Sequence, residues 1–93
     1  MRIGGRPVLD QFSATHADCR KWIGNWIADA ESSRWRTPQD IKDRYSSASF
    51  TGKNVIFNVR GNDYRLVTVV AYRVGVVTIE WIGTHAEYTT KYC

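Results

Sequence analysis

The chain has 93 residues, with 13 lysines and arginines against 9 acids, so its formal net charge is +4. This length allows one domain with one modest core, and 4 tryptophans and 5 tyrosines argue against disorder. No apolar run approaches the roughly 20 residues that span a bilayer, and the N-terminal residues lack the apolar stretch of a signal peptide. We therefore expect one cytoplasmic domain over residues 1–93, with no membrane partner and with a charge that suits an anionic one.

The cysteine content argues against a small domain stabilised by disulfides and against one stabilised by a metal ion. Cys19 and Cys93 are too few for a disulfide framework, and neither has a metal-ligand companion nearby. We interpret Cys19 as a buried thiol and Cys93 as a loose C-terminal one, as expected in the reducing cytosol. No cofactor and no metal site is predicted.

Helical signals occupy the first half of the chain after a short edge strand at Arg2 and Ile3. Pro7 suits the first turn of a helix that reaches about Thr15. Asp18 is a candidate N-cap for a second helix, which ends near residues 32–33. An apolar stripe on that helix should pack on a sheet, and it consists of Trp22, Ile23, Trp26, Ile27 and Ala30.

A third, short helix is predicted to begin at Thr37. Thr37 can cap it, Pro38 fits its first position, and Asp40 stands where a capping box places its acid. Residues 46–52 are small and polar, which favours a loop.

Three antiparallel strands are predicted from Asn54 onward, with hairpin turns at residues 62–63 and 74–75. If both loops hold two residues, Arg60 faces Arg65 and Arg73 faces Val76. Because neighbours along a strand point to opposite faces, one face is almost wholly apolar and should meet the helices; it comprises Val55, Phe57, Val59, Leu66, Thr68, Val70, Tyr72, Val77, Ile79 and Trp81. The other face carries Ile56, Asn58, Arg60, Arg65, Val67, Val69, Ala71, Arg73, Thr78, Glu80 and Ile82. The pattern predicts an α+β fold, with N-terminal helices packed on one face of a small, mainly antiparallel sheet.

Positive charge gathers on the second of these faces. Arg60 and Arg65, as cross-strand neighbours, would repel each other unless an anion lay between them, and two guanidiniums side by side make a phosphate clamp. Lys53 and Arg73 add to the charge of this region. The alternative is a solvated sheet face on which Arg60 pairs with a nearby acid.

Two histidines are available for proton transfer. His85 follows the third strand, and histidine gives or takes a proton near neutral pH; its alternative role is a hydrogen-bonded loop residue. Glu87 is a rival proton-transfer group. Tyr88 can bind a phosphate or stack on a base, or else pack as an ordinary ring. His16 is interpreted as structural.

Three segments together resemble the HigB-type mRNA interferases, toxins of type II toxin–antitoxin systems with a RelE-like fold. They are Val-Ile-Phe-Asn-Val-Arg-Gly-Asn-Asp-Tyr-Arg-Leu-Val at 55–67, Gly-Thr-His-Ala-Glu-Tyr at 83–88, and Trp-Arg-Thr-Pro-Gln-Asp-Ile-Lys at 35–42. The similarity covers nearly the whole chain, from Arg2 to about Tyr88.

The resemblance implies an endoribonuclease that cuts messenger RNA, usually on the ribosome, by metal-independent attack of the ribose 2′-OH. Arg65 would stabilise the charge that develops on the phosphate, His85 would be the acid or base, with Glu87 as its rival, and Tyr88 would orient the phosphate or share proton transfer.

The same resemblance implies the remaining contacts. Lys53, Arg60 and Arg73 are the expected RNA-binding residues. The expected protein partner is a cognate HigA-like antitoxin with a helix-turn-helix. A non-catalytic RNA- or protein-binding module on the same scaffold is the alternative function.

Overall fold

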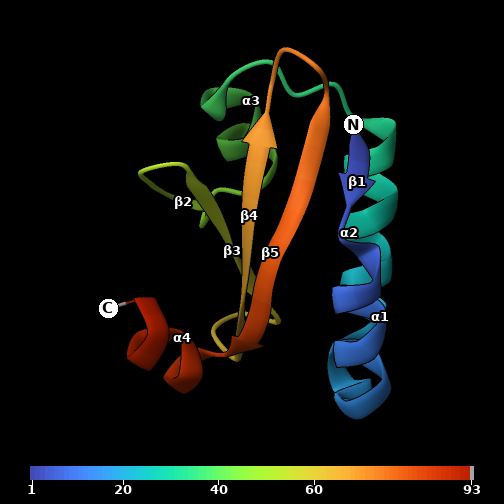
Figure 1. The fold of residues 1–93 in the computed structure, drawn as a ribbon, viewed down its shortest axis with the longest axis vertical. Coiled ribbons are helices and arrows are strands. Elements are labelled where there is room, and N and C mark those ends of the chain that lie inside the picture. Colours follow the sequence, from blue (N-terminus) through green and yellow to red (C-terminus); the bar gives the residue numbers. More distant parts are fainter. Residues whose placement is uncertain (93) are drawn as a thin grey trace.

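Five strands form one mixed sheet in the computed structural model, which describes residues 1–92. Their order across the sheet is β1-β5-β4-β3-β2 (Figure 1). β1 pairs with β5 in parallel, and all other neighbours are antiparallel. The strands are β1 (Arg2–Gly4), β2 (Ser49–Thr51), β3 (Asn54–Val59), β4 (Tyr64–Ala71) and β5 (Val76–Thr84). The predicted α+β class and the short N-terminal edge strand are confirmed, whereas β2 lies in a segment expected to be a loop.

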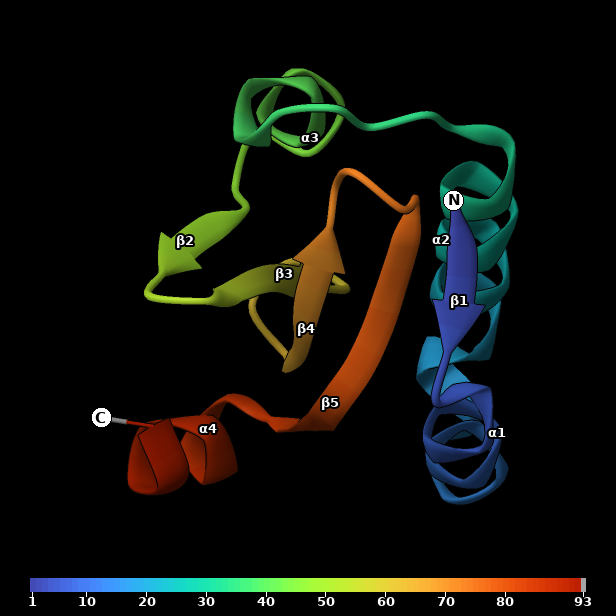
Figure 2. The same cartoon turned by 45° about the horizontal axis from the view of Figure 1, so that its top comes forward.

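The helices lie on two sides of this sheet. Their bounds are α1 (Arg6–Thr15), α2 (Arg20–Ser32), α3 (Pro38–Arg44) and α4 (His85–Tyr92), with a 3-10 turn at Ala17–Cys19 before α2. α1 and α2 run beside β1 and β5, while α4 lies apart from them where β5 ends (Figures 1 and 2). No helix in residues 1–92 is long and apolar enough to cross a membrane.

Local signals explain where α1 and α3 begin, but not where α2 begins. Pro7 lies in the first turn of α1, as predicted. Asp18 does not cap α2; it lies in the preceding 3-10 turn, and its carboxylate binds other groups. The α3 capping box is confirmed, because the Asp40 backbone N–H donates to the Thr37 hydroxyl while the Asp40 carboxylate accepts the Thr37 N–H.

One core fills the space between the helices and the face of the sheet that was predicted to be apolar. The α2 stripe supplies Trp26, which meets Phe57 edge to face with ring centroids 5.3 Å apart. Cys19 is buried in this core, as predicted, while Cys93 lies outside the described residues. The buried members from the sheet are Val55, Phe57, Val59, Tyr64, Leu66, Val77, Ile79 and Ile82.

The two hairpin registers differ from the predicted ones by two residues. Arg65 pairs with Asn58 rather than with Arg60, and Val76 pairs with Ala71 rather than with Arg73. Each loop has four residues, not two, and positive φ angles occur at Arg60 (51°) and Gly61 (69°) in the first loop and at Gly75 (71°) in the second. The predicted Arg60–Arg65 cross-strand pair is therefore wrong.

A β-bulge in β5 produces a second correction. Val67 pairs with Trp81, whereas the next residue of β4, Thr68, pairs with Ile79, so Glu80 is an extra residue. An extra residue reverses the alternation of side chains beyond it. Ile82 therefore enters the core, and Trp81 faces the opposite side of the sheet, the reverse of the predicted placement.

Candidate functional site

The turn between β3 and β4, at residues 60–63, holds two of the predicted site residues in place. The Arg65 guanidinium donates to the Asn62 backbone carbonyl at 3.4 Å and to the Asn62 side-chain oxygen at 3.3 Å. The His85 backbone N–H donates to the Asp63 carbonyl at 3.1 Å. Arg65 and the first residue of α4 are thus fixed to consecutive residues of one turn.

Arg65 lies against the sheet rather than in solvent. Arg65 is 9% exposed to solvent, and its guanidinium also donates to the Tyr64 carbonyl at 3.1 Å. A side chain on the polar face of the sheet would be expected to face solvent, but Arg65 is almost fully buried, and its guanidinium donates to Asn62 of the turn. No carboxylate among residues 1–92 forms an ion pair with this guanidinium within 4.0 Å, and neutral oxygens of Asn62 and Tyr64 accept its hydrogen bonds.

An acid on the helical side anchors the same turn. Asp18 accepts hydrogen bonds from the Tyr64 hydroxyl at 2.8 Å and from the Arg60 guanidinium at 2.9 Å. The Tyr64 hydrogen bond, followed by the bond and charge of Arg60, lowers the pKa of Asp18, so the carboxylate stays ionised. This contact connects the 3-10 turn to the hairpin, and it leaves the Arg60 guanidinium already paired with an acid. The backbone of Arg60 has a φ of 51°, in the left-handed region.

A capping box begins α4. The Thr84 backbone N–H donates to a Glu87 carboxylate oxygen at 2.9 Å, and the Glu87 N–H donates to the Thr84 hydroxyl at 3.1 Å. These hydrogen bonds, that of the backbone N–H first, lower the pKa of Glu87. The carboxylate is therefore a weaker base than an ordinary glutamate, and one of its oxygens is already used as a cap.

His85 is the first residue of α4, and its side chain is exposed. The helix continues from His85 to Tyr92. Tyr88 lies three residues after His85, and positions three apart are neighbours on a helix surface. His16, by contrast, packs as a structural residue, stacked on Phe12 with ring centroids 3.9 Å apart.

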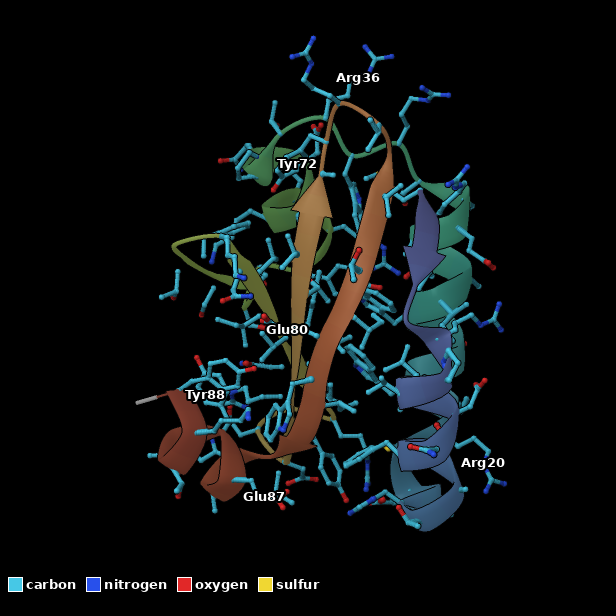
Figure 3. All side chains as sticks on the ribbon, in the orientation of Figure 1. Arg20, Arg36, Tyr72, Glu80, Glu87 and Tyr88 are labelled. Carbon is cyan, nitrogen blue, oxygen red and sulfur yellow. The ribbon has the colours of Figure 1, made fainter. Side chains whose placement is uncertain are left out.

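An aromatic cluster attaches α4 to the open face of the sheet. The Trp81 ring lies 6.4 Å from Tyr88 and 5.6 Å from Tyr92, and the two tyrosines stack at 5.3 Å. All three side chains are half-buried. Because α4 has no fully buried residue of its own, these rings form its main packing contact. Figure 3 shows Tyr88 and Glu87 on α4, at the end of the molecule opposite Arg36.

Gly83 is the residue over which the Trp81 ring lies, and it pairs across the sheet with Arg65. A Cβ at this position would overlap the indole ring, so Gly83→Ala must displace Trp81. We expect a loss of about 1–3 kcal/mol in the free energy of unfolding, as for other overpacked sites. Denaturant unfolding measures it, and near-ultraviolet circular dichroism should show the rearranged aromatic cluster.

Gly24→Ala is the matched control, since an added Cβ there meets nothing within 4 Å on an exposed face of α2. Helix propensity predicts a gain of about 0.5–1 kcal/mol at this position. Equal effects of the two substitutions would show that Trp81 moves aside freely.

The other predicted RNA-binding residues are spread over the molecule: Arg60 belongs to the 60–63 turn, but Lys53 and Arg73 lie elsewhere. Lys53 lies 3.8 Å from Glu80 in an exposed ion pair, and Arg60 pairs with Asp18 and, at 4.0 Å, with Asp63. Arg73 lies in the loop between β4 and β5, which is at the end of β4 away from Arg65. The structure thus brings together Arg65, His85 and the helix that bears Tyr88, and separates Arg73 from them.

Two features of the site were not recognised in the sequence. The Thr-x-x-Glu spacing at Thr84 and Glu87 is a capping-box signal and could have predicted α4. The contact of Asp18 with Tyr64 joins residues 46 positions apart in the sequence, and no local sequence pattern predicts it.

Within residues 1–92, no group of three or more histidine, cysteine, aspartate or glutamate side chains is placed to hold a metal ion.

Comparison with known protein families gives a match over most of the chain. Residues 19–91 match the family described as HigB_toxin, a RelE-like toxic component of a toxin–antitoxin system. No curated protein matches the sequence. The matched segment begins at the 3-10 turn and includes the whole of β2 to β5 and all but the last residue of α4, and so contains Arg65, His85 and Tyr88. The chain therefore belongs to the HigB toxin family, whose members are the RelE-like toxic components of toxin–antitoxin systems.

Proposed function

We propose that this chain is an endoribonuclease that cleaves messenger RNA, in association with the ribosome, by attack of a ribose 2′-oxygen on the adjacent phosphorus. A base removes the 2′-OH proton as the new P–O bond forms. The bond from phosphorus to the 5′-oxygen breaks, and an acid protonates that oxygen. The products are a 2′,3′-cyclic phosphate, or the 3′-phosphate formed from it, and a 5′-OH end.

The observation that carries this proposal is the convergence of Arg65 and His85 on one turn. The reaction needs positive charge at the phosphate and a group that exchanges protons near neutral pH. The Arg65 guanidinium, which pairs with no carboxylate of residues 1–92, can supply the first, and an exposed imidazole at the start of α4 can supply the second. Membership of a toxin family supports the assignment independently.

The geometry favours His85 over Glu87 as the proton-transfer group. The Glu87 carboxylate caps α4 and has a lowered pKa, so it accepts a proton less readily. Tyr88, half-buried against Trp81 and one helical turn from His85, is proposed to orient the phosphate. Arg65 is proposed to stabilise the charge on the five-coordinate phosphorus. Lys53 and Arg60 would hold flanking RNA, each after exchanging an acid for a phosphate.

The proposal includes the cellular setting. The enzyme would act in the cytoplasm on messenger RNA under translation, and a HigA-like antitoxin with a helix-turn-helix would neutralise it. Membership of a toxin–antitoxin family implies an antitoxin partner. The helix-turn-helix of that antitoxin and the toxin surface that it covers belong to the proposal.

Induced expression in a bacterial host tests the function directly. We expect arrested growth and new messenger RNA 5′ ends within coding regions, each bearing a hydroxyl rather than a phosphate. Co-expression with the antitoxin should restore growth. Cleavage of translated messenger RNA in a purified system should persist when the protein is pre-treated with a chelator and the ribosomes are kept intact.

Two outcomes would contradict this proposal. A chain that binds RNA, leaves transcripts intact and is harmless on expression would be a non-catalytic binding module. A chelated protein that cuts only after a divalent metal is restored would contradict the metal-independent chemistry.

A further inference from the structure

A groove at the other end of the molecule collects arginines that the proposed reaction does not use. The groove is open, has a volume of about 810 Å³, and is lined by residues 1–2, residues 31–36 and the loop 72–75. Arg2, Arg34, Arg36 and Arg73 all line it, and all four are exposed. Their combined charge equals the formal net charge of the whole chain.

None of these four arginines forms an ion pair with an acid of residues 1–92, whereas Arg6, Arg44 and Arg60 each do. The acid that also lines the groove, Glu31, pairs with Arg6 at 3.5 Å. Among residues 1–92, no acid lies within 4.0 Å of any of the four guanidiniums in the groove. Like charges at one surface repel one another, so an anion that enters the groove would relieve this repulsion.

Trp35 explains why two of the guanidiniums project into the groove. Its residue is 4% exposed, and its ring packs 6.3 Å from Phe57 and 6.3 Å from Tyr45 in the core. Arg34 and Arg36, on either side of it in the sequence, are both exposed. The buried indole thus holds the backbone of this segment on the core and leaves the two flanking guanidiniums in solvent.

The groove is separate from the proposed active site. Figure 3 shows Arg36 at one end of the molecule, among other side chains that end in nitrogen, and Glu87 and Tyr88 at the opposite end. The longest dimension of the molecule is 32 Å. A single phosphate cannot contact both places, whereas a nucleic acid can, because its backbone carries charges along its whole length.

We propose that this groove is a second RNA-binding surface, which grips the phosphate backbone at a distance from the scissile bond. The choice of RNA as the anion rests on the proposed function. The guanidinium fork matches phosphate oxygens, and the only large apolar side chain exposed in the groove is Val74, too little for the apolar centre of a protein interface. Such a surface adds affinity without reading sequence.

Fluorescence anisotropy with a labelled RNA whose 2′-oxygens are all methylated tests the proposal, because this probe cannot undergo the proposed cleavage. We expect Arg34→Ala/Arg36→Ala to weaken binding about 25-fold at ~0.1 M salt, the counterion-release value for two phosphates on a single strand. The slope of log K against log salt concentration should become shallower by about 1.4. Arg73→Ala alone, in the loop 72–75 of the groove, should make this slope shallower by about 0.7.

Arg20→Ala/Lys21→Ala is the matched control, since it removes the same charge from two exposed residues that form no ion pair among residues 1–92 and lie outside the groove and the proposed active site. Equal affinities and slopes for the two double variants would overturn the groove proposal. The proposal would also be overturned if the Arg34→Ala/Arg36→Ala variant bound RNA as wild type does but lost binding to poly-glutamate. That result would assign the groove to an acidic protein. If RNA binding falls as expected but wild type never cuts translated messenger RNA, the proposed function fails and the groove proposal stands.

Discussion

His85→Gln should abolish toxicity on induced expression and lower the rate of messenger RNA cleavage by about 10² to 10⁴, the usual contribution of a general acid or base. The imidazole is exposed at the first position of α4, and only its backbone is tied to the turn at Asp63. Glutamine keeps a hydrogen-bonding side chain but exchanges no proton near neutral pH. The fold should therefore survive, and single-turnover cleavage of translated messenger RNA measures the loss.

Two control variants identify the cause of that loss. His16→Gln changes the other histidine, which is stacked on Phe12, and should leave the cleavage rate almost unchanged. Glu87→Gln removes the carboxylate from the capping box and should cost about 1 kcal/mol or less of stability, with cleavage retained in the folded fraction. If His85→Gln cleaves at the normal rate while Glu87→Gln does not, Glu87 is the proton-transfer group.

The faces of the sheet were predictable from the sequence even though the pairing was not. Side chains alternate with a period of two, so an error of two residues in register leaves every residue on its predicted face. Phe57 and Leu66 therefore lie in the core as predicted. The error arose because Asn62 and Asp63 looked like a two-residue turn, whereas the positive φ angles lie at Arg60 and Gly61, within a loop of four residues.

A β-bulge has a larger effect than a register error of two, because it changes the face. The extra residue at Glu80 moves Trp81 onto the open side of the sheet, where its ring meets Tyr88 and Tyr92. Nothing in the alternation of residues 76–82 announces the bulge. The packing of α4 on the sheet was therefore not predictable from pattern alone, although the capping spacing at Thr84 could have located where the helix begins.

The sequence did not predict the contacts that position the candidate site residues. His85 and Arg65 were selected as proton-transfer and charge-stabilising groups, and the structure brings both to residues 62–63. The role of Arg60 changed most. Its guanidinium binds Asp18, a partner 42 positions away in the sequence, so the expected clamp of two arginines is replaced by one buried guanidinium held by a turn.

Arg65→Ala should lower the cleavage rate by about 10² to 10³, the usual effect of removing a group that stabilises transition-state charge. The same change removes hydrogen bonds to Asn62 and Tyr64 from a site that is 9% exposed. We therefore also expect a loss of about 1–3 kcal/mol in the free energy of unfolding, which a domain with typical stability of about 5–15 kcal/mol tolerates. Cleavage must be measured where circular dichroism shows the variant to be folded.

Asn62→Ala separates the charge of Arg65 from its role in the turn. It removes one acceptor of the guanidinium, the side-chain oxygen at 3.3 Å, and keeps the positive charge and the two backbone acceptors. Some loss of stability with most of the cleavage rate retained is the expected result. If Asn62→Ala and Arg65→Ala slow cleavage equally, the geometry of the turn is the cause and Arg65 acts as a structural residue. If only Arg65→Ala slows it, and Arg65→Lys restores part of the rate, the charge acts on the phosphate, because lysine supplies a cation without the planar fork.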